Sequence, residues 1–108
     1  MTALREDLIT ELTGILRKAR EWNLSMGGLH ALIALDEEKE HPLSCGELAY
    51  RTGVGKESLT GLLNTLELSG LALREYGKNP LDRRMVQVSL TPRGKEVVAF
   101  IMGKGETP

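Results

Sequence analysis

Cysteine and aromatic residues are scarce in this chain of 108 residues, which contains one cysteine, one tryptophan, one phenylalanine and two tyrosines. A single cysteine, Cys45, excludes an internal disulfide framework and favours a reducing compartment such as the cytoplasm. Long apolar runs are also missing. No stretch approaches the ~20 residues that a membrane helix needs, and the N-terminal MTALREDL has acids where a signal peptide has an apolar core. We therefore expect a cytoplasmic protein with no membrane partner.

Net charge is almost absent, at −1, but the two signs are separated along the chain. Residues 1–50 hold nine acids and five bases, a net of −4, whereas residues 74–95 hold six bases and two acids, a net of +4. Such a separation predicts a polyanion-binding edge on an acidic body. A solvated basic loop without a partner explains the charge alone equally well.

Apolar residues spaced by three and four predict helices over residues 4–22, 26–35, 45–51, 56–69 and 92–102. Ser25, Ser44 and Thr91 are expected to cap three of these helices, the last of which has a proline at its first position. Gly53 and Gly55 lie in the tight turn before helix 56–69, where either glycine can adopt a positive φ.

Between the last two helices the apolar period changes from 3.6 to 2, which predicts two strands. In the first strand we expect Leu71 and Leu73 on one face and Arg74 and Tyr76 on the other. In the second strand the shared apolar face is Val86, Val88 and Leu90. Residues 77–84 form the connection, which is longer than the usual two to five residues of a hairpin loop.

This order predicts a mainly α fold with a small β-hairpin (α+β), namely a winged helix-turn-helix. We expect a single domain over residues 1–102 and a disordered tail over 103–108. Within the domain, residues 1–23 form an N-terminal helix, 42–91 a DNA-binding core with its wing at 77–84, and 92–102 a C-terminal helix.

The face of helix 56–69 opposite its leucines carries small hydrogen-bonding residues, as required of a helix that enters a major groove about 12 Å wide. An asparagine on such a face can bond bidentately to adenine, and hydroxyl groups can bond base edges or phosphates. Polar residues opposite a leucine stripe are equally typical of any surface helix. The candidate DNA-binding residues are Lys56, Ser58, Thr60, Gly61 and Asn64.

The predicted wing carries Lys78, Arg83 and Arg84, which can reach phosphates or the narrow, strongly negative minor groove. Asp82 and Arg74 are expected to organise the wing, because a carboxylate beside guanidinium groups can fix one of them in place. The alternative is an ordinary surface ion pair worth about 0–1 kcal/mol.

Residues 42–94 resemble the DNA-binding domain of the multiple-antibiotic-resistance regulator (MarR) family. The matching motifs are PLSCGELAYRTGVGKESLTGLLNTLELSGL and DRRMVQVSLTPRG. The resemblance implies that Arg84 is a minor-groove arginine and that Asp82 is its organiser. It also implies a homodimer and a small-molecule effector of unknown identity.

The two long C-terminal helices that, together with the first helix, build the dimer in this family have no match here. The dimer is therefore expected to be different, smaller or absent. We expect the contact to use helix 4–22 and the C-terminal helix, with Trp22, Phe100, Ile101 and Met102 as exposed apolar residues.

The sequence contains only weak indications of metal binding, redox chemistry or catalysis. His30, His41 and Cys45 are a poor zinc set because neither a second cysteine nor a paired histidine accompanies them. Cys45 is interpreted as a small buried cysteine or, as the alternative, an oxidation sensor with a pKa lowered by its helix N-terminus. Because enzyme motifs are missing, we expect no catalytic residues, cofactor or metal.

The sequence thus predicts a sequence-specific regulator of transcription, a repressor, that binds double-stranded DNA. The alternative is a winged-helix interaction module that does not bind DNA.

Overall fold

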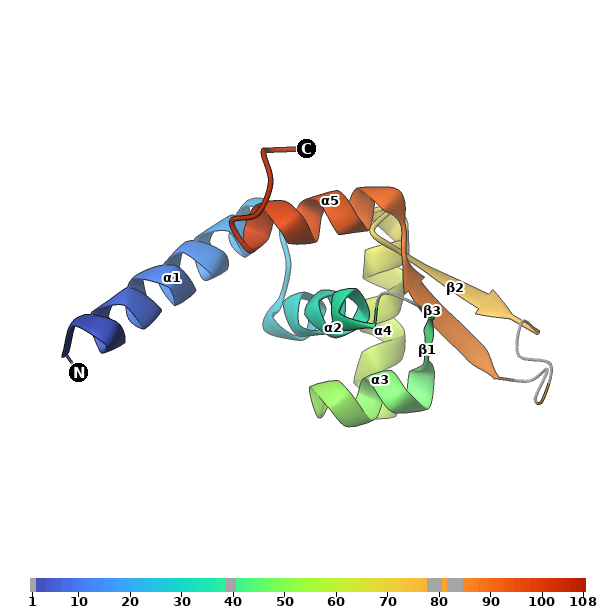
Figure 1. Cartoon of the computed structure of the whole chain (residues 1–108). Helices are drawn as coiled ribbons and strands as arrows, with labels where there is room; N and C mark the ends of the chain where they lie inside the picture. The colour runs from blue at the N-terminus through green and yellow to red at the C-terminus, as the bar shows by residue number, and fades with distance from the viewer. Residues whose placement is uncertain (1, 39–40, 78–80, 82–84) are drawn as a thin grey trace.

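Five helices and three strands follow one another in the expected order in the computed structural model, which describes residues 2–38, 41–77, 81 and 85–108 (Figure 1). The elements are α1 (Thr2–Glu21), α2 (Met26–Glu37), β1 (Leu43–Ser44), α3 (Cys45–Thr52), α4 (Lys56–Leu68), β2 (Ala72–Tyr76), β3 (Val86–Leu90) and α5 (Pro92–Ile101).

The three expected helix caps are confirmed. Ser25 and Thr91 each accept a hydrogen bond through the side-chain hydroxyl, from the backbone N–H of Gly28 and Gly94 respectively, at 3.0 Å. Ser44 forms a full capping box with Glu47, in which each side chain accepts from the other residue's backbone N–H. These bonds satisfy donors that the first turn of a helix leaves without partners.

The two glycines at the α3–α4 turn adopt different conformations. Gly53 has a φ of 71° and ends α3 in the left-handed region, which costs glycine little. Gly55, the N-cap of α4, has a φ of −64°, so it does not use the positive φ that a glycine can adopt. One left-handed residue is enough to turn the chain here, because Gly55 is already in an extended conformation before α4.

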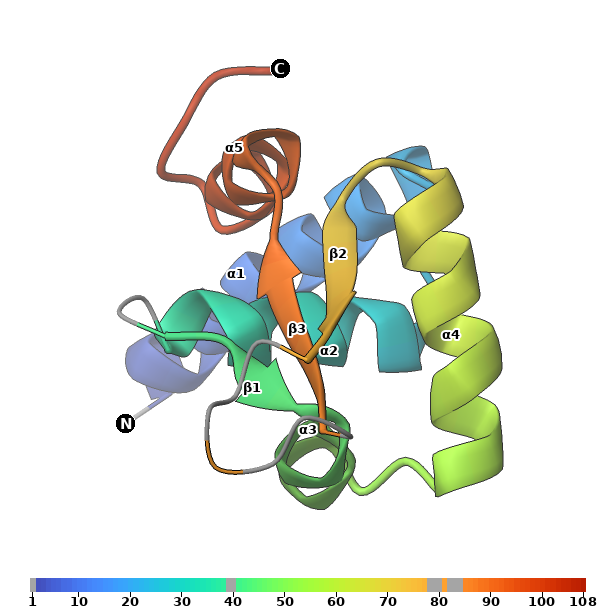
Figure 2. The same ribbon diagram turned by 90° about the vertical axis from the view of Figure 1, so that its right-hand side faces the viewer.

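The sheet has the order β1-β3-β2, with both pairs antiparallel (Figure 2). Val88 is fully buried in the central strand. In β2, the expected pairing of Leu71 with Leu73 on one face is wrong: Leu71 is buried just before the strand, and Leu73 is 45% exposed. Because β2 begins at Ala72, the alternation is shifted by one residue, so Ala72 is buried and Arg74 partly so.

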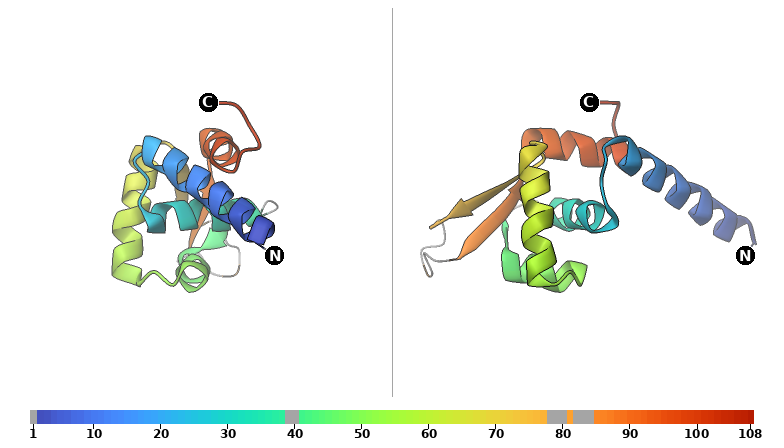
Figure 3. Two further views of the ribbon diagram at one scale, coloured as in Figure 1. Left: turned by 90° about the vertical axis from the view of Figure 1, so that its left-hand side faces the viewer. Right: turned by 180° about the vertical axis from the view of Figure 1, so that it is seen from behind.

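The core surrounds α2, which contacts α3, α4, α5 and β3. Leu32, Leu43, Leu48, Leu63 and Leu66 are among its fully buried side chains. The C-terminal part of α1 packs on α5, whereas its N-terminal part projects away from the body, on the side opposite the hairpin (Figures 1 and 3). Among the described helices, none is long and apolar enough to cross a bilayer.

Candidate nucleic-acid interface

The α3–turn–α4 unit is held rigidly by contacts within α3 and the turn. Leu48 anchors α3 in the core. Near the end of this helix, Thr52 Oγ1 donates to the carbonyl of Leu48 at 2.8 Å and accepts from the backbone N–H of Val54 at 3.3 Å. The Thr52 side chain thereby connects the last turn of α3 to the loop that precedes α4, and so fixes the angle between the two helices.

Helix α4 divides into a buried and an exposed face, as the leucine spacing predicts. Leu59, Leu63 and Leu66 are buried. The five candidate DNA-binding residues of this helix are all exposed: Lys56, Ser58, Thr60, Gly61 and Asn64. A Cβ placed on Gly61 would meet nothing within 4 Å, so the helix surface is open at its centre.

Two hydroxyl groups on α4 are already engaged with the helix backbone. Thr60 Oγ1 donates to the carbonyl of Lys56 at 3.1 Å, and Thr65 Oγ1 donates to the carbonyl of Gly61 at 3.2 Å. Their hydrogens therefore point along the helix, and the oxygen lone pairs are left to face outward as acceptors.

Arg74 crosses from β2 to α4 and contacts two side chains there. Its Nε donates to the Glu67 carboxylate and its Nη2 donates to Asn64 Oδ1. Glu67 is not among the residues predicted for this site. Its spacing of three residues from Asn64 on the helix is the signal that could have indicated it. The role of Arg74 in organising the wing stays a prediction, since Asp82 lies outside the described residues.

The hairpin strands β2 and β3 extend away from the helical body (Figure 1). Gly77, with a φ of 71°, starts the connection between them. The other predicted wing residues, Lys78, Arg83 and Arg84, lie outside the described residues, as Asp82 does.

A hollow of about 330 Å³ lies between the start of α3, α4 and β2, lined by Cys45, Lys56, Thr60 and Arg74 among others. Burial raises the pKa of the Cys45 thiol, and the positive charge of Arg74 opposes that change without cancelling it. The lowered pKa of the oxidation-sensor alternative is therefore wrong, because loss of hydration on burial outweighs the charge of the nearby cation. Cys45 is half-buried rather than buried as expected, and its raised pKa favours a structural cysteine over an oxidation sensor.

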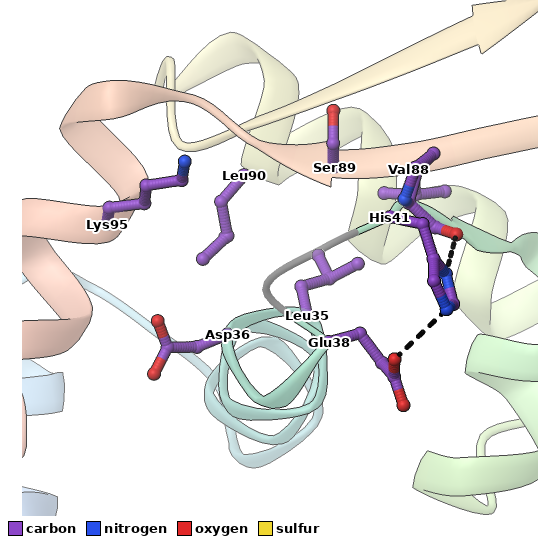
Figure 4. Close-up of a pocket in the computed structure, with 9 residues that line it drawn as sticks. Leu35, Asp36, Glu38, His41, Val88, Ser89, Leu90 and Lys95 are labelled. Atoms are coloured by element: carbon purple, nitrogen blue, oxygen red, sulfur yellow. Dashed lines mark hydrogen bonds and ion pairs between the residues drawn. The ribbon is translucent and has the colours of Figure 1, made fainter.

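A second hollow, of about 370 Å³, opens between the end of α2, β3 and the start of α5 (Figure 4). Leu35, Val88 and Leu90 contribute its apolar wall. Charged or titratable side chains surround that wall, namely Asp36, Glu38, His41 and Lys95. Glu38 Oε2 lies 3.4 Å from His41 Nε2, and its other oxygen accepts from Arg51 of α3.

Metal ligands are not assembled in the described part of the chain: no three His, Cys, Asp or Glu side chains there are placed to hold one ion. His30, His41 and Cys45 therefore do not form a common site.

The apolar surface predicted for a dimer is partly wrong. Ile101 is 1% exposed, and Trp22, Phe100 and Met102 are half-buried against the core. Lys18 lies over the Phe100 ring and Arg93 over the Trp22 ring, each 5.2 Å from the ring centroid. These residues make contacts within a single chain, because α5 packs on α1. Among the described side chains of α1, the large apolar ones that are exposed are Leu8, Ile9 and Leu12.

Curated proteins similar in sequence are HTH-type transcriptional regulators. The chain is 39% identical over 72 residues to the HTH-type transcriptional repressor YetL of Bacillus subtilis, covering 67% of this chain and 42% of YetL. It is 32% identical over 88 residues to the uncharacterized HTH-type regulator YfiV of the same organism, covering 79% and 52%. The chain thus spans about half the length of these relatives. No protein-family model matches it.

Solved structures share the fold over nearly the whole chain. The transcriptional regulator Tm0710 of Thermotoga maritima has a TM-score of 0.80 at 27% identity, over 95% of this chain and 70% of its own. The Staphylococcus aureus MepR–DNA complex has a TM-score of 0.75 at 19% identity, over 96% and 82%. A MarR-family regulator from Silicibacter pomeroyi has a TM-score of 0.70 at 24% identity, over 94% and 66%. The expected fold and the resemblance are confirmed: the chain has a winged helix-turn-helix fold like that of MarR-family regulators, and its sequence is similar to HTH-type transcriptional regulators.

Proposed function

We propose that this chain is a sequence-specific DNA-binding regulator of transcription, a repressor without enzymatic activity, that acts as a homodimer in the cytoplasm. The observation that carries the proposal is the face of α4 opposite its buried leucines, on which Lys56, Ser58, Thr60, Gly61 and Asn64 are all exposed. Two comparisons support the proposal by analogy: YetL is named as a repressor, and MepR was solved as a complex with DNA.

The mechanism places α4 in a major groove and the wing on the flanking backbone or minor groove. Helix α4 brings little charge of its own, since Lys56 is the cation on its DNA-facing side and Glu57 lies beside it. Most of the phosphate attraction therefore has to come from the basic segment 74–95, in which Lys78, Arg83 and Arg84 belong to the wing. A dimer so bound represses by covering the promoter.

A titration of labelled duplex DNA of random sequence at low salt tests the proposal most directly. We expect micromolar or tighter binding that weakens steeply as salt is raised, because bound cations release counterions from the phosphates. Selection from a random duplex library should then yield an inverted repeat with half-site centres roughly 10 bp apart.

Failure to bind duplex DNA at any salt concentration would favour the interaction module over the regulator. In that case the same exposed face of α4 and the basic hairpin would contact a protein partner. The effector implied by the resemblance stays a prediction; NadR was solved with 4-hydroxyphenylacetate. The hollow in Figure 4 is a place in the described structure with room for such a small molecule.

A further inference from the structure

Arg74 of β2 connects the hairpin to the exposed face of α4 through two hydrogen bonds. Its guanidinium lies between the Glu67 carboxylate, which accepts from Nε, and the Asn64 carboxamide, which accepts from Nη2. The Arg74 side chain is 19% exposed and the Glu67 side chain 30%, so this pair is shielded from water on one side. Two fixed partners on one helix leave the guanidinium little freedom to turn.

The chemistry of this contact determines how the Asn64 amide is oriented. A guanidinium carries donors and no acceptor, so the amide atom that faces it must be the oxygen. The Asn64 Nδ2 group is then turned away from Arg74. Asn64 is exposed on the same face of α4 as Thr60 and Gly61, so its two N–H donors are available to a ligand of that face.

An amide held in this way recognises a different base from a free amide. Bidentate recognition of adenine uses an acceptor for the N6 amino group together with a donor for N7. With a guanidinium already bonded to Oδ1, an amino group approaching that oxygen meets a positive charge. Guanine presents two adjacent acceptors, N7 and O6, and needs donors alone.

We infer that Arg74 is a specificity-determining positioning residue, which holds the Asn64 amide as a donor and gives this point of α4 a preference for guanine over adenine. The inference rests on the proposed function. It also gives Glu67 a role, because the carboxylate keeps the guanidinium in place when DNA arrives.

The test is selection from a random duplex library with the whole chain, its Arg74→Met variant and an Arg20→Met control. Methionine keeps much of the side-chain bulk and removes the donors. Arg20 is an exposed arginine of α1, so its replacement matches the change in charge. The parent chain and Arg20→Met should select guanine at one position of each half-site. Arg74→Met should select adenine there, with the guanine-to-adenine affinity ratio changed about tenfold.

A second variant covers the case in which Arg74→Met does not fold. Asn64→Asp keeps an acceptor for Arg74 and replaces the outward donor with an acceptor. It should change the preference at the same position to cytosine, whose N4 amino group donates. A merely structural role for Arg74 would weaken binding to every duplex without changing the selected base.

The inference is overturned if the parent chain selects adenine at this position, or if guanine persists in a folded Arg74→Met variant. Where Arg74→Met does not fold, persistence of guanine in Asn64→Asp overturns it. These outcomes differ from failure of the proposed function, in which the parent chain selects no sequence and binds no duplex.

Discussion

The first turn of α5 lies against the chain segment that leaves α4, and Gly94 makes this approach possible. A Cβ at residue 94 would lie 2.0 Å from the carbonyl oxygen of Leu71 and 3.0 Å from its carbonyl carbon. That same oxygen accepts a hydrogen bond from the backbone N–H of Thr91 at 3.1 Å. The contact joins α5 to the start of the hairpin through backbone atoms, which cannot turn aside as a side chain can.

We expect Gly94→Ala to lower the free energy of unfolding by about 1–3 kcal/mol or more, because the backbone has to move to admit the methyl group. The matched control is Gly61→Ala, where a Cβ meets nothing within 4 Å. Alanine at this helical position should raise the free energy of unfolding by about 1 kcal/mol. Urea denaturation of both variants measures the difference. Similar midpoints for the two would contradict the Leu71 contact.

Cys45 shows what a sequence does not reveal about a single residue. Its place at the start of α3 follows from the sequence, but the direction of its pKa shift does not. The shift depends on burial by α4 and on the charge of Arg74, and both belong to chain segments that follow Cys45 in the sequence. The partners of Arg74 were unpredictable for the same reason: they depend on how β2 lies across α4.

At the scale of elements, an ion pair connects the end of α2 to α3. Arg51 donates to the Glu38 carboxylate, which also lies near His41. The hydrogen bond from Arg51 lowers the pKa of the Glu38 carboxyl below its ordinary value of 4.5, and the charges of Arg51 and His41 act in the same direction. The pair therefore contributes stability above that ordinary value and loses it as the pH falls through the lowered pKa.

Arg51→Met should return the pKa of Glu38 toward 4.5 and remove this part of the acid sensitivity of folding. An NMR titration of the Glu38 carboxyl measures the pKa, and thermal unfolding followed from pH 7 downward measures the stability. Arg20→Met, on α1, serves as the control and should leave both unchanged. An unaltered Glu38 titration in Arg51→Met would show that the pair does not form in solution.

The predicted wing can be tested directly by substitution of Arg84. If Arg84 contacts the minor groove, Arg84→Ala should weaken DNA binding without unfolding the chain, and reduce the salt-dependence slope by about one unit. It should also reduce any preference for A·T pairs beside the half-site, where the groove is narrow. Binding isotherms at several salt concentrations measure both effects. No change at all would mean that the hairpin is not a DNA-binding wing.

Asp82→Asn separates positioning from bulk charge in the wing. The substitution adds positive charge but removes the proposed organiser of Arg84, so we expect a loss of binding smaller than that of Arg84→Ala. Tighter binding at every salt concentration would show that charge alone governs the wing and that Asp82 has no organising role.

Helix starts were predictable from the sequence where the capping pattern lies within a few neighbouring residues. Ser25, Ser44 and Thr91 each cap a helix through bonds to residues three positions away, so the pattern is visible in a short stretch of sequence. The register of β2 could not be predicted from a short stretch of sequence, because it depends on where β2 pairs with β3. The apolar residues Leu71 and Leu73 suggested a shared face, but the strand starts only where the chain meets β3, with Ala72 opposite Leu90.

At the scale of the whole molecule, the chain is elongated, with principal extents of 50 × 28 × 25 Å. The projecting part of α1 lies at one end and the hairpin at the other (Figures 1 and 3). The exposed Leu8, Ile9 and Leu12 are on this projecting part, away from α4. Contacts between two copies through α1 would therefore leave both α4 faces and both hairpins open to DNA.

A homodimer should sediment at about 24 kDa at micromolar protein, twice the chain mass of 11.9 kDa. Leu12→Glu should shift it to the monomer, because a carboxylate would be buried without a partner in an apolar contact. Leu68→Glu is the matched control: Leu68 is 91% exposed at the end of α4, and its replacement should leave the dimer intact.

A dimer contact through α1 also predicts how the Leu12→Glu substitution should change DNA binding. Because a dimer contacts two half-sites at once, Leu12→Glu should bind an inverted repeat no more tightly than a single half-site, although the substituted residue lies far from α4. Gel-shift titrations on the two duplexes measure this directly. A parent chain that sediments as a clean monomer, or a Leu12→Glu variant that still prefers the inverted repeat, would exclude α1 as the contact between copies.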